Sequence, residues 1–232
     1  MAVLDHIHMG SANIYTSAYN MTREMKIGHY DGGFMNSITI GHKAFPLGGG
    51  VYIEVEGVID PFAVPPEKEP WFVKKALAFK TEVFSGLCLR VDTMDELADV
   101  AKRLGGIVNL RPAQRIRPDG PGVMSFSAPG GPNIPNPWLS GYPNWYCFQD
   151  RMYCHPSGQP AINAPGLVNP QGVTWLEVGG TKEAMTKWLG QSPSDFGMRF
   201  NGKEPGLYAI GVKTDVGEVV LRRPAATQST SS

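Results

Sequence analysis

Two stretches of the chain, residues 3–10 and 51–58, alternate polar and apolar side chains with a period of two. This alternation is typical of β-strands, because successive side chains of a strand point to opposite faces of the sheet. On each stretch two ionisable residues share one face, and these residues are His6, His8, Glu54 and Glu56. If the two strands pair in the matching register, two imidazoles and two carboxylates converge. The plain alternative is an antiparallel pair whose polar face meets solvent.

Three other stretches carry apolar residues at the spacing of one helix face, and we expect these helices over residues 11–25, 93–104 and 181–190. Ser11 or Asn13 can cap the first helix through a side-chain oxygen. Thr93 and Glu96 have the spacing of a capping box at the start of the second helix. Thr181 can cap the third helix, which is expected to end at a glycine.

Further short strands, separated by turns rich in glycine and proline, are expected over residues 34–40, 86–92, 123–128, 144–149, 173–178, 207–212 and 218–222. A strand–helix–strands pattern therefore occurs over residues 1–60 and 84–160, and again as a partial unit over 161–223. Residues 61–83 form a proline-rich connector, and residues 224–232 are expected to be a disordered tail. The sequence thus predicts an α+β protein of repeated βαβββ units, whose mixed sheet cups around a cavity.

Charge and composition narrow the class of protein. The 232 residues carry 21 basic and 21 acidic side chains, so nothing favours nucleic acid or a membrane as a partner. No apolar run approaches the roughly 18 residues needed to span a bilayer, and the first residues do not have the pattern of a signal peptide. The cysteines, Cys88, Cys147 and Cys154, fit no disulfide framework and suit a reducing compartment. We therefore expect a cytoplasmic protein that acts on a small molecule, with a homodimer as one open possibility.

The residues around the alternating positions resemble a known superfamily. Leu-Asp-His-Ile at residues 4–7, with Tyr-Ile-Glu-Val at residues 52–55, resembles the vicinal oxygen chelate superfamily, and more narrowly its glyoxalase-like domains. The aromatic stretch 144–150, followed by His155 and Pro156, is similar to the same subgroup. The resemblance extends over most of the first two units and continues more weakly into the third.

The resemblance implies one divalent metal ion, held by His6 on the first strand and Glu54 on the last strand of the first unit, with His8 as a further ligand. It does not distinguish Zn, Mn, Fe and Ni. The second unit departs from the superfamily pattern, because Gly86 stands where its first-strand histidine is expected and Gln149 where a glutamate is expected. A metal site would then depend on the first unit, or the metal has been lost, as in metal-free binding proteins of the superfamily.

Such a site is compatible with three functions. The first is a metal-dependent lyase or isomerase that acts on a small oxygenated organic molecule through a metal-stabilised enolate, with Glu56 moving the proton. With iron, His6, His8 and Glu54 would resemble the triad of a ring-cleaving extradiol-type dioxygenase. The third is a metal-free protein that binds a small molecule. We favour the first, because Glu56 is well placed to transfer a proton and the second unit offers no obvious imidazole beyond His155.

Further residues are candidates for the rim of the cavity. We assign catalytic roles to Gln149 and His155 beside Glu56, and substrate-binding roles to Trp145, Phe148 and Arg115. Other aromatic residues that could line an apolar pocket are Trp71, Trp138 and Tyr142, although a core position is favoured for each. Arg115 belongs to a segment that reads as a basic loop and could clamp a carboxylate. We expect His29 and His42 to be exposed beside glycines, and residues 46–50 to form a loop.

Overall fold

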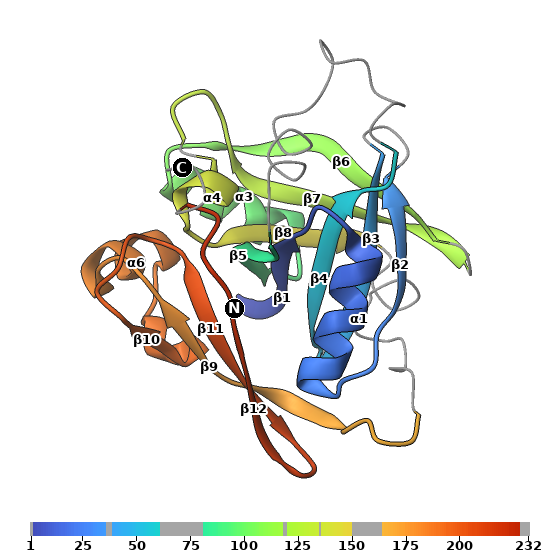
Figure 1. Ribbon diagram of the computed structural model, residues 1–232. Coiled ribbons are helices and arrows are strands. Elements are labelled where there is room, and N and C mark those ends of the chain that lie inside the picture. Colours follow the sequence, from blue (N-terminus) through green and yellow to red (C-terminus); the bar gives the residue numbers. More distant parts are fainter. Residues whose placement is uncertain are drawn as a thin grey trace.

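The computed structural model describes residues 2–35, 39–60, 81–117, 120–134, 136–149 and 164–227. For residues 110–117, 120–123, 139 and 149 it describes the backbone alone. The described chain forms a barrel of strands with helices on its outside and a smaller sheet beside it (Figure 1). The predicted α+β class with repeated βαβββ units is confirmed.

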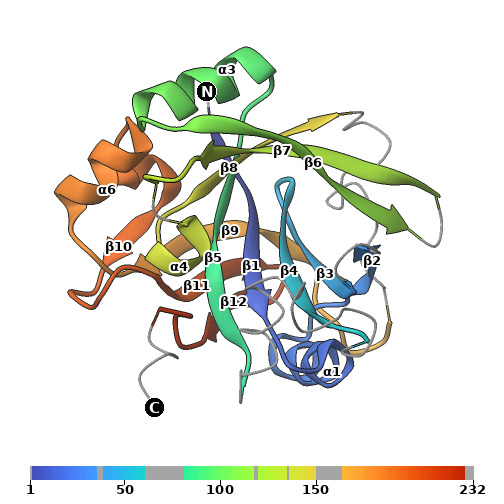
Figure 2. The same ribbon diagram turned by 90° about the horizontal axis from the view of Figure 1, so that it is seen from above.

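Eight of the described strands close into a barrel in the order β1-β4-β3-β2-β6-β7-β8-β5. They are β1 (Val3–Gly10), β2 (Tyr30–Met35), β3 (Ile40–Gly48), β4 (Val51–Val58), β5 (Val83–Arg90), β6 (Ile107–Arg117), β7 (Gly120–Gly130) and β8 (Asn144–Gln149). β1 pairs in parallel with β4, and β5 pairs in parallel with β8. The two units join because their first strands, β1 and β5, pair with each other and β2 pairs with β6 (Figure 2).

The predicted helices are present as α1 (Ile14–Met25), α3 (Met94–Arg103) and α6 (Lys182–Leu189). Asn13 caps α1, since its side chain accepts the backbone N–H of Thr16 at 3.0 Å. Thr93 and Glu96 complete the predicted capping box at the start of α3. The buried faces of these helices pack against the strands and enclose the hydrophobic core.

A second sheet lies beside the barrel in the order β10-β9-β11-β12 (Figure 1). Its strands are β9 (Pro170–Val178), β10 (Met198–Phe200), β11 (Leu207–Thr214) and β12 (Gly217–Arg222), with the 3-10 helix η3 (Pro193–Phe196) before β10. Leu176 and Ile210 of this sheet belong to the same buried core as Ile7 of the barrel. The predicted hairpin is confirmed as β11 and β12.

Two barrel strands occupy segments that the sequence assigned to turns or loops. β3 extends to Gly48, so residues 46–48 belong to a strand, and Pro46 lies opposite Tyr52 of β4. β6 runs through the segment that was expected to be a basic loop. Each strand pairs with a neighbour on both sides, and this tertiary pairing outweighs the weak local strand signal.

The chain end is ordered further than expected. The backbone N–H of Phe84 donates to Pro224 at 2.9 Å, and the N–H of Ala226 donates back to Phe84 at 2.8 Å. Ala225 and Ala226 are buried against β5, so the predicted tail is wrong for residues 224–227. Residues 228–232 and most of the predicted connector, 61–80, lie outside the described residues. No helix among the described residues is long and apolar enough to cross a membrane.

Candidate metal centre

The pairing of β4 with β1 on one side and β3 on the other brings the polar faces of three strands together inside the barrel. His8 of β1 lies opposite Glu54 of β4, and Glu56 of β4 lies opposite His42 of β3. The β1–β4 pair is parallel and buried, so the alternative of an antiparallel pair facing solvent is wrong. Alternation along each strand then directs every second side chain into the same interior space.

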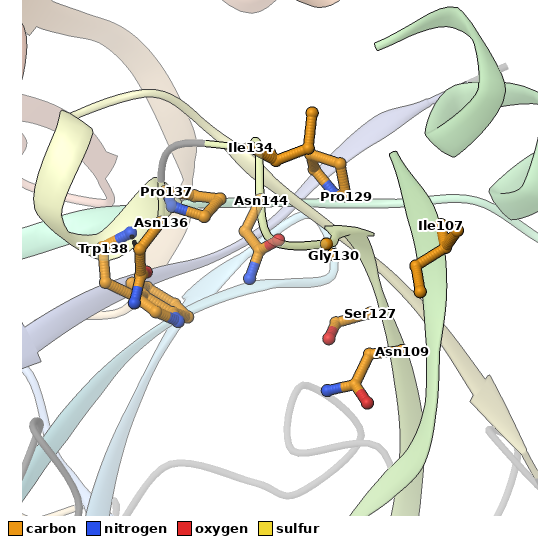
Figure 3. Close-up of a pocket in the computed structure, with 11 residues that line it drawn as sticks. Ile107, Asn109, Ser127, Pro129, Gly130, Ile134, Asn136, Pro137, Trp138 and Asn144 are labelled. Carbon is orange, nitrogen blue, oxygen red and sulfur yellow. Dashed lines mark hydrogen bonds between the residues drawn. The ribbon is translucent and has the colours of Figure 1, made fainter. Parts of the chain in front are cut away.

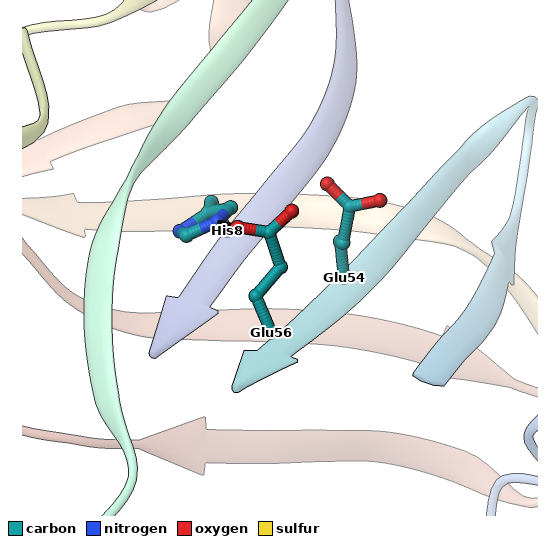
Figure 4. Close-up of side chains that lie close together, drawn as sticks. All are labelled: His8, Glu54 and Glu56. Atoms are coloured by element: carbon teal, nitrogen blue, oxygen red, sulfur yellow. Dashed lines mark hydrogen bonds and ion pairs between the residues drawn. The ribbon is translucent and has the colours of Figure 1, made fainter. Parts of the chain in front are cut away.

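Three of these side chains form a compact donor cluster. Ligand atoms of His8, Glu54 and Glu56 all lie within 4.8 Å of one another (Figure 4). Their exposed fractions are 2%, 3% and 6%, so the cluster is almost dry. His8 Nε2 contacts Glu56 Oε2 directly.

His6 lies at the edge of this cluster, and Asp5 and Arg90 hold its ring in place. Asp5 Oδ1 lies 2.8 Å from His6 Nδ1, and Arg90 Nη1 lies 2.6 Å from Asp5 Oδ2. A register shift between β1 and β5 at Asp5 lets this carboxylate reach its neighbour's ring. With Nδ1 beside the Asp5 carboxylate, Nε2 is the ring nitrogen nearer to Glu54, 3.6 Å from Glu54 Oε2.

His42 is fully buried, so the prediction that it is exposed is wrong. Its Nδ1 lies 2.8 Å from Glu56 Oε1 and 3.5 Å from Glu54 Oε1, while Nε2 has no hydrogen-bond partner among the described residues. The sequence did not indicate a buried strand at His42, because Gly41 precedes it and Pro46 follows in the same strand. His29, also expected to be exposed, is half-buried and lies 3.0 Å from Thr22 Oγ1 through Nδ1.

The imidazoles determine the charge of Glu56. Burial taken alone raises the pKa of this carboxyl group, but His8 and His42 outweigh burial and hold the pKa well below its usual range. Glu56 is therefore a carboxylate at neutral pH. The second carboxyl group of the cluster, that of Glu54, lies close to it. Two carboxylates in so small and dry a space need positive charge nearby.

The donor set fits a divalent cation on these grounds. Imidazole nitrogen and carboxylate oxygen are the ligands that Zn, Mn, Fe and Ni accept. His8, Glu54 and Glu56 provide one imidazole and two carboxylates, and His42 contacts Glu56 from the side of β3. Among the described residues, the side chains that fit a metal ion all belong to the first unit.

The second unit contributes a different wall. A Cβ added to Gly86 would lie 3.0 Å from Cε3 and 3.1 Å from Cζ3 of Trp138, a residue of the short helix α4 (Pro137–Ser140). The Trp138 ring in turn lies 4.4 Å from the His8 ring, centroid to centroid. The indole therefore fills the space beside the strand position where the superfamily pattern places a second histidine.

A pocket of about 420 Å³ opens on the other side of Trp138 (Figure 3). Its described polar lining consists of neutral side chains from four elements, namely Asn109, Ser127, Asn136 and Asn144. Sequence reasoning named Trp138 only as one of several aromatic candidates. It missed the asparagines, because amide side chains in loops and strand ends are common without any ligand.

The remaining predicted site residues fall into two groups. Trp145 is buried in the core, with its ring centroid 6.2 Å from that of Trp188, and its predicted substrate contact stays a prediction. Phe148 stacks on Tyr146 at 5.9 Å, and the Tyr146 ring lies 5.5 Å from that of His6. The remaining predicted residues, whose side chains lie outside the described part of the chain, are Arg115, Gln149 and His155.

Comparison with known proteins agrees with this geometry. The family model of the glyoxalase-like domain matches residues 4–192. The chain therefore belongs to the glyoxalase-like domain family, within the vicinal oxygen chelate superfamily. No curated protein matches the chain.

Solved structures show the same fold at low sequence identity. A hypothetical protein from Staphylococcus aureus is 11% identical with a TM-score of 0.59, over 97% of this chain and 86% of that chain. Methylmalonyl-CoA epimerase from Mycobacterium tuberculosis is 13% identical with a TM-score of 0.42, over 62% and 85%. A variant of 4-hydroxymandelate synthase from Streptomyces coelicolor is 11% identical with a TM-score of 0.44, over 97% and 64%. The first likeness concerns the fold alone, and the other two add nothing to it.

Proposed function

We propose that this protein is a metal-dependent lyase or isomerase that transfers a proton next to a carbonyl group of a small oxygenated substrate. The observation that carries the proposal is the buried cluster of His8, Glu54 and Glu56 beside the Asp5–His6 pair. The cluster supplies cation ligands, and the pair supplies a base at its edge. Both lie inside a barrel, where water is largely excluded.

His8, Glu54 and Glu56 would hold the ion, with His42 orienting Glu56. When bound, a divalent ion supplies Lewis-acid polarisation of a substrate carbonyl, which makes the neighbouring C–H acidic. This assignment moves Glu56 from the predicted role of proton carrier to that of ligand. The reason is its close contact with His8 and its low pKa, which makes it a good ligand and a weak base.

His6 is the base in this proposal, rather than the ligand that the resemblance implied. Asp5 orients the ring and stabilises the charge that the ring gains when Nε2 takes a proton. Arg90 holds Asp5 in place through its ion pair. Nε2 lies 3.6 Å from Glu54 Oε2, so the base is a direct neighbour of a residue that would hold the ion.

The donor set also bears on the dioxygenase alternative. That chemistry uses two imidazoles and one carboxylate with a redox metal. The compact cluster has one imidazole and two carboxylates, which supports the proton-transfer chemistry more than oxygen activation. A metal-free binding protein would have no need for two buried carboxylates.

The test is hydrogen–deuterium exchange at the carbon next to the carbonyl of hydroxyacetone and D-fructose, followed by NMR in D₂O. Manganese-loaded protein is expected to catalyse the exchange under argon as fast as in air, whereas chelator-treated protein is not. His6→Gln should lose at least about 100-fold in exchange rate, and His29→Gln, a matched change outside the cluster, should keep it. Exchange no faster than with the metal-free protein for both probes would contradict the proposal. Dependence on iron and O₂ would favour the dioxygenase.

A further inference from the structure

The pocket beside the metal centre and the centre itself share one wall. Trp138 lines the pocket, and its ring also lies 4.4 Å from that of His8. Asn144, at the start of β8, lies opposite Cys88 of β5, and Cys88 lies opposite His6 of β1. The Trp138 side chain therefore lies against both the pocket and the donor cluster.

The described lining of the pocket combines uncharged polar side chains with apolar ones, among them Ile107, Ile134 and Trp138. Asn109 of β6 and Ser127 of β7 lie opposite each other in adjacent strands, while Asn136 and Asn144 come from the segments around α4 and β8. Figure 3 shows these four side chains around the same space, with Trp138 beside them. Among the described residues that line the pocket, none is ionisable.

This set of groups is suited to hydroxyl groups. A side-chain amide has donors and an acceptor, and a serine hydroxyl is both donor and acceptor, so these residue types can match a hydroxyl that donates and accepts. Asn136 Oδ1 already accepts the backbone N–H of Trp138 at 3.1 Å, which leaves its NH₂ group to donate to a ligand. The flat indole can pack against the C–H face of a carbon chain or ring. A phosphate or carboxylate would instead call for a positive partner.

We propose that the pocket binds the hydroxylated part of a neutral, sugar-like hydroxycarbonyl compound, with Trp138 as the residue that determines its specificity. The inference rests on the proposed function, which places the carbonyl end of the same molecule at the cluster. Asn109, Ser127, Asn136 and Asn144 bind the hydroxyl groups of the remainder. Gly86 is part of the arrangement, because a side chain there would displace the indole from its place between pocket and His8.

The test measures binding to chelator-treated protein by isothermal titration calorimetry, with D-fructose as the neutral probe and D-glucuronate as an anionic probe of similar size. D-Fructose is expected to bind with a Kd of roughly 1 mM or below, and glucuronate at least about 10-fold more weakly. Asn144→Leu, which keeps the side-chain volume, should weaken D-fructose binding about 10-fold. Trp138→Ala should do the same. Trp175→Phe, in the second sheet and away from the pocket, should leave binding unchanged.

Gly86→Ala provides a second route to the same conclusion. Its added methyl group meets only the Trp138 ring, which must shift by a few tenths of an ångström, so D-fructose binding should weaken severalfold while circular dichroism stays native. Three results would overturn the proposal: no heat of binding with D-fructose, equal or tighter binding of glucuronate, or binding unchanged by Asn144→Leu and Trp138→Ala. Manganese binding measured on the same samples separates the two ideas, because the metal centre can be intact while the sugar site is refuted, and the reverse.

Discussion

The two halves of the barrel have the same order of elements but opposite interiors. In the first half, β1 to β4, the inward positions hold His6, His8, His42, Glu54 and Glu56, all of them buried. In the second half, β5 to β8, the described residues of the interior include Gly86, Asn144 and aromatic side chains, together with the charged Arg90, which pairs with Asp5 of β1. In our proposals the first half binds a cation and transfers a proton, and the second half recognises neutral groups.

The two interiors also differ in how much their buried polar groups cost in stability. A buried carboxylate without a partner costs several kcal/mol, so the first half is stable only because each of its charges is paired. A buried amide or hydroxyl costs less, and it can be satisfied by water or by a ligand. Substitutions that leave one of these charges unpaired should therefore have larger effects on stability than substitutions of the neutral residues in the second half.

The largest expected effect comes from breaking the ion pair behind the cluster. Arg90→Met removes the cation that pairs with the fully buried Asp5 carboxylate, and should lower the free energy of unfolding by about 3–5 kcal/mol. Urea denaturation measures this loss. The double variant Asp5→Asn/Arg90→Met should recover part of the loss, because the uncompensated charge is gone. A loss below about 1 kcal/mol would place this pair among ordinary surface ion pairs.

The sequence anticipated the first half better than the second. Alternation of histidine and glutamate with apolar residues located β1 and β4, because a half-polar buried strand has a period of two. His42 was misplaced, since Gly41 and Pro46 disguise β3 as a turn segment. The basic residues of β6 likewise suggested a loop, although pairing with β2 and β7 makes it a strand.

The position of Trp138 could not be read from the sequence at all. Its contact with His8 depends on the path of a loop, and loop paths follow from tertiary packing rather than from local pattern. Gly86 was noted as a departure from the superfamily pattern, but its reason appears only when the indole is seen beside it. The pocket beside Trp138 was also not predicted, because tertiary packing alone brings its asparagines together.

A substitution in the second half sharpens the comparison. Gly86→His restores the residue type of the superfamily pattern, but the new side chain would meet the indole of Trp138, so we expect a loss of about 1–3 kcal/mol. In Gly86→His/Trp138→Ala the clash is relieved and most of the stability should return. Thermal unfolding followed by circular dichroism measures both variants. Equal losses in the single and the double variant would show that the indole is not what excludes a histidine there.

Removal of a helix cap should lower the free energy of unfolding by a similar amount in the two halves. Asn13→Ala removes the cap of α1, which packs on the first half, and Thr93→Ala removes the cap of α3, which packs on the second. Each should lower the free energy of unfolding by about 1 kcal/mol, because both caps act on local backbone N–H groups. Chemical denaturation of the two variants side by side is the measurement. A difference of more than about 1 kcal/mol between them would show that the halves differ in more than their interiors.

The smallest effect is expected outside the barrel, at the ion pair of Glu177 and Arg222 in the second sheet. Arg222 Nη1 lies 2.8 Å from Glu177 Oε2. Hydrogen bonds from Arg222 and Asn201 lower the pKa of Glu177. Its contribution is therefore present above the pKa of the unfolded state and is lost as the pH falls through the lowered pKa of the folded state. Arg222→Met should cost only about 0.2–1 kcal/mol at neutral pH and less in acid. Urea denaturation at neutral and at acid pH measures the loss in free energy of unfolding. A larger loss in acid than at neutral pH would contradict this prediction.

The central claim is that the first half alone builds the metal centre, from His8, Glu54 and Glu56, with His6 beside it as a base. The most direct test is the metal content of His8→Gln and His6→Gln, purified without an affinity tag, loaded with manganese and measured by atomic emission. Our account predicts close to no bound metal in His8→Gln and close to one ion per chain in His6→Gln. Metal retained in His8→Gln and lost in His6→Gln would contradict it.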